Sequence, residues 1–155
     1  SNAIAAVNHV ISNAKAGDVV NMSVGGGMSS TLDNAVMTAA GKGILFAIAA
    51  GNSAVDCSYS SPARVNATGV YTVSAMDNYA RLASFSNYGA PVDFAAPGNG
   101  INTTTKNGGY ANGCWGTSFA APHVAGLLAL KGNNIRANGY ITGDKDSKAD
   151  PIASL

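Results

Sequence analysis

Apolar residues along the chain alternate between helical spacing and short unbroken runs. Four of them near the N-terminus fall on one helical face: Ile4, Val7, Ile11 and Ala14. This stripe predicts a helix that Gly17 ends, with His9 on its solvent face. A second helix is predicted over Ser29–Ala40, with Ser29 or Ser30 as its N-cap.

Four short apolar runs predict strands. They are Asp18–Val24, Ile44–Ala50, Val70–Met76 and Val92–Ala96. Ile44–Ala50 shows no alternation, as expected of a strand covered on both faces, and Asp18–Val24 is also expected to be mostly buried. Asn99–Asn112 is polar and glycine-rich, which favours a hairpin or a loop. Strands that alternate with helices predict an α/β fold with a parallel sheet.

The two ends of the chain differ from its patterned centre. Ser1–Ala3 resembles the remnant of a purification tag, so the fold is expected to begin at Ile4 as a piece of a longer protein. Residues 4–131 carry the helical and strand patterns. Residues 132–155 are polar and predict a surface tail of the same domain, with a strand near Tyr140–Ile141.

Composition narrows the class of protein. The 155 residues are 46% hydrophobic and only 11% charged, with a net charge of +1. This length suits one domain with a core, and the charge does not favour nucleic acid or a membrane surface as a partner. The longest apolar run, Ile44–Ala50, is too short to span a membrane. Cys57 and Cys114 are far apart in sequence, and both a disulfide and two free thiols are compatible with that spacing.

The stretch from Gly116 to Gly126 carries the strongest chemical signal. A Gly-Thr-Ser turn leads into small and apolar residues, which predicts a helix beginning near Ser118 with Pro122 in an early turn. Two interpretations of Ser118 follow. Its hydroxyl caps the helix, or it is a nucleophile whose developing negative charge is favoured by the helix N-terminus.

The run Gly-Thr-Ser-x-Ala-x-Pro-His-Val-Ala-Gly is similar to the segment around the active serine of subtilisin-like serine proteases. The resemblance extends from about Asn8 to Leu130 and implies the C-terminal part of a three-layer, parallel-sheet subtilisin-like fold. It also implies that Ser118 is the nucleophile of a secreted endopeptidase. A different hydrolase with a Gly-x-Ser-x-Gly elbow is disfavoured, because no such motif surrounds Ser118.

Two further segments match this family in its own order. Ser23-Val24-Gly25-Gly26 resembles the strand that pairs with the substrate peptide and walls its pocket. Ala49-Ala50-Gly51-Asn52 resembles the segment that ends in the oxyanion-hole asparagine. The resemblance therefore implies Asn52 and Ser118 as catalytic residues and Ser23, Val24, Gly25, Gly26, Ala50 and Gly51 as substrate-binding residues. Ser84–Gly89 and Ala95–Gly98 also look like family segments and are expected to serve the fold.

The family's catalytic Asp and His have no counterpart in this sequence. His123 is five residues after Ser118 on the predicted helix, and His9 lies on another element, so neither is expected to be the base. We therefore expect the chain alone to be inactive. A protease-like domain that binds peptides without cutting them is the alternative. Without the missing N-terminal part, the strand at Val19–Val24 should form an exposed sheet edge and favour a homo-oligomer.

No cofactor is required by this chemistry. Asp93, beside backbone carbonyls near Ala67–Gly69, is a weak candidate for a structural calcium site, because a single carboxylate makes a poor one.

Overall fold

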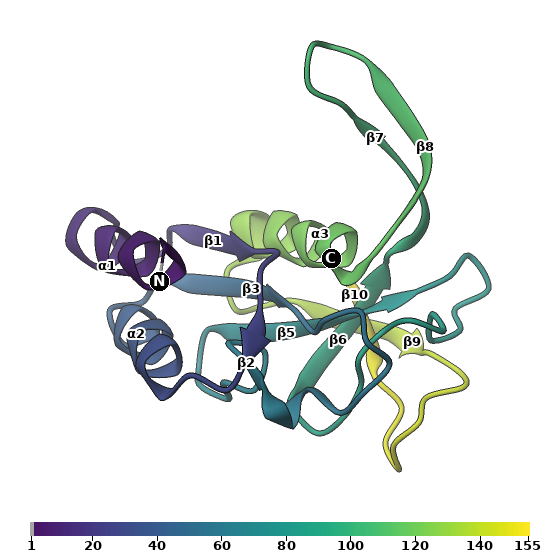
Figure 1. Cartoon of the computed structure of the whole chain (residues 1–155), viewed down its shortest axis with the longest axis horizontal. Coiled ribbons are helices and arrows are strands. Elements are labelled where there is room, and N and C mark those ends of the chain that lie inside the picture. Colours follow the sequence, from purple (N-terminus) through teal and green to yellow (C-terminus); the bar gives the residue numbers. More distant parts are fainter. Residues whose placement is uncertain (1) are drawn as a thin grey trace.

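A computed structural model describes residues 2–155 and contains one large sheet, two small ladders and three α-helices (Figure 1). In chain order the elements are α1 (Asn2–Asn13), β1 (Val19–Met22), β2 (Gly26–Gly27), α2 (Ser30–Gly41), β3 (Leu45–Ala49), a short 3-10 turn (Cys57–Tyr59), β4 (Ser60–Ser61), β5 (Val70–Met76), β6 (Val92–Pro97), β7 (Asn99–Thr104), β8 (Tyr110–Trp115), α3 (Thr117–Lys131), β9 (Arg136–Tyr140) and β10 (Pro151–Ser154). Asn2 and Ala3 begin α1, and Ser1 lies outside the described residues.

The large sheet has six strands in the order β1-β3-β5-β6-β10-β9. The first five run parallel and β9 is antiparallel to β10. The predicted α/β class with a parallel sheet is therefore confirmed.

Strand β3 shows how the layers are built, because its side chains alternate between two apolar clusters. Phe46 and Ile48 pack in the cluster formed with α1 and α2, whereas Ala47 and Ala49 pack in the cluster formed with α3. All five residues of β3 are buried. A sheet between two helical layers is the predicted three-layer arrangement, and Figure 1 shows α1 and α2 apart from α3.

Strand β1 is less buried than its apolar sequence predicted. Only Met22 is fully buried, while Val19 and Val20 are half-buried and Asn21 is exposed. The reason is position: β1 is the first strand of the sheet and has β3 as its one neighbour, so one edge is open among the described residues.

The expectation of a surface tail over residues 132–155 needs correction. The strand expected near Tyr140 exists as β9, but β10 also forms and lies inside the sheet, parallel to β6. Ile141 and Asp150 are buried at 2% and 4% exposure. The segment is therefore an integral part of the domain rather than a tail.

Residues 99–115 form the β7–β8 hairpin, which projects from the body of the domain (Figure 1). Cys114 lies on this hairpin and Cys57 lies buried in the core, and both are free thiols. The sequence was compatible with either a disulfide between them or two free thiols, and the structure has the free thiols.

Candidate active site

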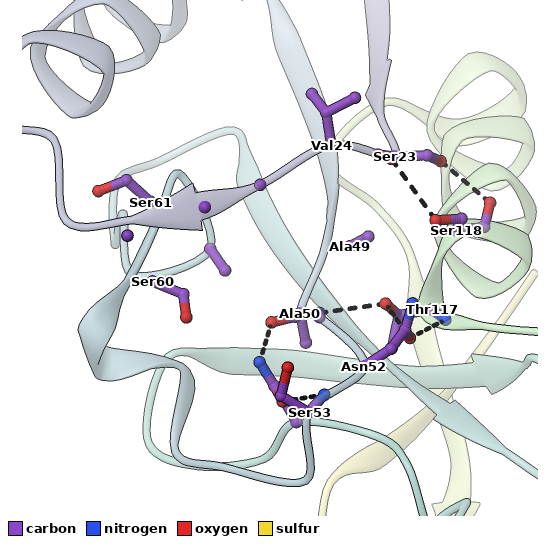
Figure 2. Close-up of a pocket in the computed structure, with 16 residues that line it drawn as sticks. Ser23, Val24, Ala49, Ala50, Asn52, Ser53, Ser60, Ser61, Thr117 and Ser118 are labelled. Carbon is purple, nitrogen blue, oxygen red and sulfur yellow. Dashed lines mark hydrogen bonds between the residues drawn. The ribbon is translucent and has the colours of Figure 1, made fainter.

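A cavity of about 420 Å³ lies where β1 and β3 end and α3 begins. Its walls come from five segments: Ser23–Gly27 after β1, Ala49–Ser53 after β3, residues 60, 61 and 63 around β4, Asn87, and the first turn of α3. All eight residues predicted as catalytic or substrate-binding line it, Gly51 included. Figure 2 labels five of them: Ser23, Val24, Ala50, Asn52 and Ser118. Convergence of strand ends at one sheet edge brings these distant segments together.

Ser118 is half-buried in the first turn of α3. It does not cap that helix, because the N-cap is Gly116 and the helix already includes Ser118. The capping interpretation of Ser118 is therefore wrong. Its hydroxyl has one long contact, 3.5 Å to the Ser23 carbonyl oxygen, and lies beside the positive end of the helix dipole.

The helix begins at Thr117, so Pro122 is its sixth residue and lies in the second turn. In this position Pro122 cannot donate the hydrogen bond that the Ser118 carbonyl oxygen would otherwise accept within the helix. The Ser23 hydroxyl donates to that oxygen instead, at 3.0 Å (Figure 2). The proline thus frees an acceptor that ties the end of β1 to the serine backbone.

Asn52 is held from α3 by Thr117. The Asn52 Oδ1 accepts from the Thr117 N–H at 2.8 Å and from the Thr117 hydroxyl at 2.9 Å. The same hydroxyl oxygen accepts from the Gly51 N–H at 3.1 Å. Because both bonds to the Asn52 side chain go to its oxygen, its Nδ2 carries no hydrogen bond among the described residues and is available to donate.

The part of the wall at Gly25–Gly27 is backbone alone, because glycine has no side chain. Gly26 pairs with Ser61 and Gly27 with Ser60 in the β2–β4 ladder. The Ser61 hydroxyl also accepts from the Ser29 N–H at 2.8 Å, which fixes the ladder to the start of α2. No charged side chain lines the cavity, so it suits an uncharged group.

The two histidines lie away from this cavity. The His123 Nδ1 is 2.8 Å from the Phe119 carbonyl oxygen on the same helix, and the His9 ring bonds to Asn13 on α1. Neither residue is among those that line the cavity. Within residues 2–155 the Ser118 hydroxyl therefore has no base within hydrogen-bond distance.

Asp93 is the carboxylate that the sequence offered as a weak candidate for a structural calcium site. One of its oxygens accepts from the Thr72 N–H at 2.8 Å, and no arrangement of three or more His, Cys, Asp or Glu side chains suited to a metal occurs in residues 2–155. Burial raises the pKa of Asp93 to about 6. Calcium binding at Asp93 therefore stays a prediction.

Sequence patterns did not single out two residues that shape the cavity. Thr117 is fully buried and links Gly51 to Asn52, although it was noted only as part of the Gly-Thr-Ser turn. Asn87 lies in the segment expected to serve the fold alone, yet it lines the cavity. Their neighbours in the sequence give no signal of these roles, because the side chains bond to a loop far away along the chain.

The sheet, the helix carrying Ser118 and the cavity between them define a class of α/β proteins whose site lies at the carboxyl ends of parallel strands. Sequence comparison gives the family within that class: residues 1–140 match the Subtilase family, and the chain belongs to it. The predicted resemblance to subtilisin-like serine proteases is thereby confirmed.

Two relatives and one solved structure show how far the likeness extends. The chain is 50% identical to alkaline serine exoprotease A of Vibrio alginolyticus over 130 residues, which cover 84% of the chain and 24% of the relative. It is 44% identical to an extracellular serine proteinase of Thermus sp. over 131 residues, 84% of the chain and 32% of the relative. A cold-adapted subtilisin-like serine proteinase superposes with a TM-score of 0.87 at 36% identity, over 98% of the chain and 60% of that structure.

The chain thus spans a third or less of the length of these two relatives. No helix in residues 2–155 is both long and apolar enough to cross a membrane.

Proposed function

We propose that this chain is the C-terminal part of a secreted serine endopeptidase domain, which cleaves peptide bonds through an acyl-enzyme at Ser118. Asn52 Nδ2 and the Ser118 N–H donate to the oxyanion that forms during attack. The backbone of Ser23–Gly26 binds the substrate chain, and the cavity beside it takes the side chain that precedes the cut bond.

One observation carries this proposal. The Ser118 hydroxyl, in the first turn of α3, and an Asn52 amide with an unoccupied donor line the same uncharged cavity. Acyl transfer needs this combination, since the nucleophile and the oxyanion donors must both lie near one carbonyl group. In subtilisin itself, loss of the asparagine donor lowers kcat by about 10²–10³-fold, a magnitude that belongs to that enzyme.

The general base must come from outside the described residues. A serine hydroxyl needs a base that takes its proton, and His9 and His123 bond elsewhere. We expect the family's Asp and His to be supplied by the remainder of the catalytic domain. The chain alone should accordingly show no useful hydrolysis of peptides.

A fluorophosphonate probe tests both parts of the proposal, because it reacts with an activated serine. Intact-mass analysis of the longer catalytic domain should show one adduct that maps to Ser118, and Ser118→Ala should abolish it. Ser29→Ala, which alters another serine at a helix start, should leave the adduct in place.

The chain alone, shown to be folded by circular dichroism, should give no adduct. An adduct at Ser118 in the chain alone would mean that a base exists within it, and would overturn the predicted inactivity. A longer domain that stays unlabelled but binds peptides would favour the alternative of a non-catalytic peptide-binding domain, for which the uncharged cavity and the backbone wall would suffice.

A further inference from the structure

The loop that carries Asn52, residues 50–55, has a backbone that most sequences avoid. Gly51 has a φ of +110° and Ala54 has a φ of +54°. Alanine rarely adopts a positive φ, so a loop of this shape persists only where surrounding contacts hold it. Asn52 lies between these two residues. The position of its side chain therefore depends on whatever holds the loop.

Asn87 makes hydrogen bonds on both sides of Asn52. Its Nδ2 donates to the Ala50 carbonyl oxygen at 2.9 Å, before Asn52. Its Oδ1 accepts from the N–H groups of Ser53 at 2.9 Å and Val55 at 3.2 Å, after Asn52. Figure 2 shows dashed bonds at Ala50 and Ser53 on this side of the cavity. The backbone N–H of Asn87 adds a bond to the Gly51 carbonyl oxygen at 2.9 Å.

The contact between Asn87 and the loop is close as well as polar. A Cβ atom on Gly51 would overlap the Nδ2 of Asn87, so only glycine lets this amide reach the backbone. Asn87 is 3% exposed, which leaves water little access to replace these bonds. The missing side chain at Gly51 thus leaves the space that the buried Asn87 amide occupies.

Thr117 and Asn87 act on different parts of Asn52. Thr117 bonds to the side-chain oxygen from α3, whereas Asn87 bonds to the backbone on either side. Neither uses the Asn52 Nδ2. The arrangement leaves that donor free while restraining the atoms that carry it.

We propose that Asn87 is a positioning residue for the oxyanion donor: it holds residues 50–55 so that the Asn52 Nδ2 faces the carbonyl group under attack by Ser118. This inference rests on the proposed function of Asn52 and Ser118. Asn87 itself does not touch the reacting atoms. Its effect should therefore appear in the rate of the chemical step and not in substrate binding.

Kinetics of the longer catalytic domain test the proposal. Asn87→Ala should lower kcat by about 10- to 100-fold per active site, with KM changed by about twofold or less, because a misplaced donor weakens transition-state binding. Active sites are counted by fluorophosphonate titration, so that unfolded enzyme does not enter the rate. Ser74→Ala, which removes a buried hydrogen bond to Asp150 away from the loop, is the matched control and should keep kcat.

Asn87→Asp gives a signature that a general structural role would not give. Aspartate keeps both acceptor bonds, but only its protonated form can donate to the Ala50 carbonyl oxygen. The ratio of its kcat to the wild-type kcat should therefore rise as the pH is lowered, whereas the ratio for Asn87→Ala should stay constant. If Asn87→Ala does not fold, this pH dependence decides the question.

The chain alone provides a readout that needs no catalysis. In a ¹⁵N-labelled sample, Asn87→Ala should lower the NMR order parameters of Ser53 and Val55 and change the side-chain amide signal of Asn52, and Ser74→Ala should do neither. An unchanged kcat per active site in Asn87→Ala would overturn the inference. If the wild-type domain were not labelled at Ser118, the proposed function would fail, and the NMR result alone would decide whether Asn87 positions the loop.

Discussion

Asp150 offers a stability prediction whose size follows from the structure. This carboxyl is 4% exposed, accepts a hydrogen bond from the Ser74 hydroxyl at 2.7 Å and lies near three other carboxyls, those of Asp93, Asp144 and Asp146. Burial, opposed in part by the Ser74 bond, raises its pKa from 3.8 to about 7. Asp150 directly precedes β10, so a charge on its carboxyl affects the packing of that strand against the sheet.

The sign of the effect is set by which state holds the proton. Below pH 4 the carboxyl is protonated in both the folded and the unfolded chain, and it contributes no pH dependence. Between about pH 4 and pH 7 the unfolded chain loses the proton while the folded chain keeps it, so the free energy of unfolding falls as the pH rises. Above about pH 7 the carboxyl is ionised in both states, and the free energy of unfolding falls no further. At about 1.4 kcal/mol for each pKa unit, the upper bound is about 4 kcal/mol.

Asp150→Asn should remove this loss. The amide oxygen can still accept from the Ser74 hydroxyl, and the backbone bond from residue 150 to Asp144 is unaffected. The variant should match the wild type near pH 4 and exceed it above pH 7, with a rise in Tm of about 16 °C at most for a chain of this size.

Urea unfolding and thermal melts from pH 4.5 to pH 8.5, in the presence of EDTA, measure the difference. Asp77→Asn is the control that should give a nearly constant difference over this range: although desolvation opposes them, the bonds that Asp77 accepts from Arg81 and Tyr79 lower its pKa from 3.8, so this carboxyl is ionised in both states. The reasoning about Asp150 is refuted if the stability difference between wild type and Asp150→Asn is the same at pH 4.5 and pH 8.5.

Three further predictions concern the site and the sheet edge. Thr117→Val should cost about 1–3 kcal/mol in urea unfolding, because the Gly51 N–H and the Asn52 Oδ1 lose a buried partner, and Thr117→Ser should restore most of it. Gly51→Ala should destabilise more than Gly17→Ala: both residues have positive φ, but only at Gly51 does the added Cβ overlap a neighbour, so equal losses would contradict this account. We also propose that the open edge of β1 pairs with a second copy of the chain, and light scattering that shows a monomer at all concentrations would refute this.

Local sequence patterns predicted the elements whose signal lies within the element itself. Ile44–Ala50 is apolar throughout because β3 is covered on both faces, and the helix at Ser118 follows from a glycine turn and a run of small residues. The sequence did not predict β10, because its signal is not local. Its four residues are half-buried, and they pair on one side with β6, a strand far away in sequence, which no local period records.

The residues of the candidate site also divide into those with a local signal in the sequence and those without one. Ser118 and Asn52 were found through a resemblance carried by contiguous motifs, and the structure brings both to one cavity. Thr117 and Asn87 were not found as site residues, because their roles consist of hydrogen bonds across more than thirty residues of sequence. Pro122 was expected where its missing N–H would have no partner within the helix, but as the sixth residue of α3 it leaves the Ser118 carbonyl oxygen free for the Ser23 hydroxyl.

The β2–β4 ladder makes the cavity wall open to change during evolution. Two residue pairs join the strands, and the glycines at 26 and 27 contribute backbone alone. A Cβ atom at either glycine would meet nothing within 4 Å, so a larger side chain there could narrow or recharge the cavity without disturbing a packed neighbour. Gly51 lacks this freedom, because Asn87 fills the space beside it. Related chains could therefore diverge in what they accept at positions 26 and 27 while the machinery around Asn52 stays fixed.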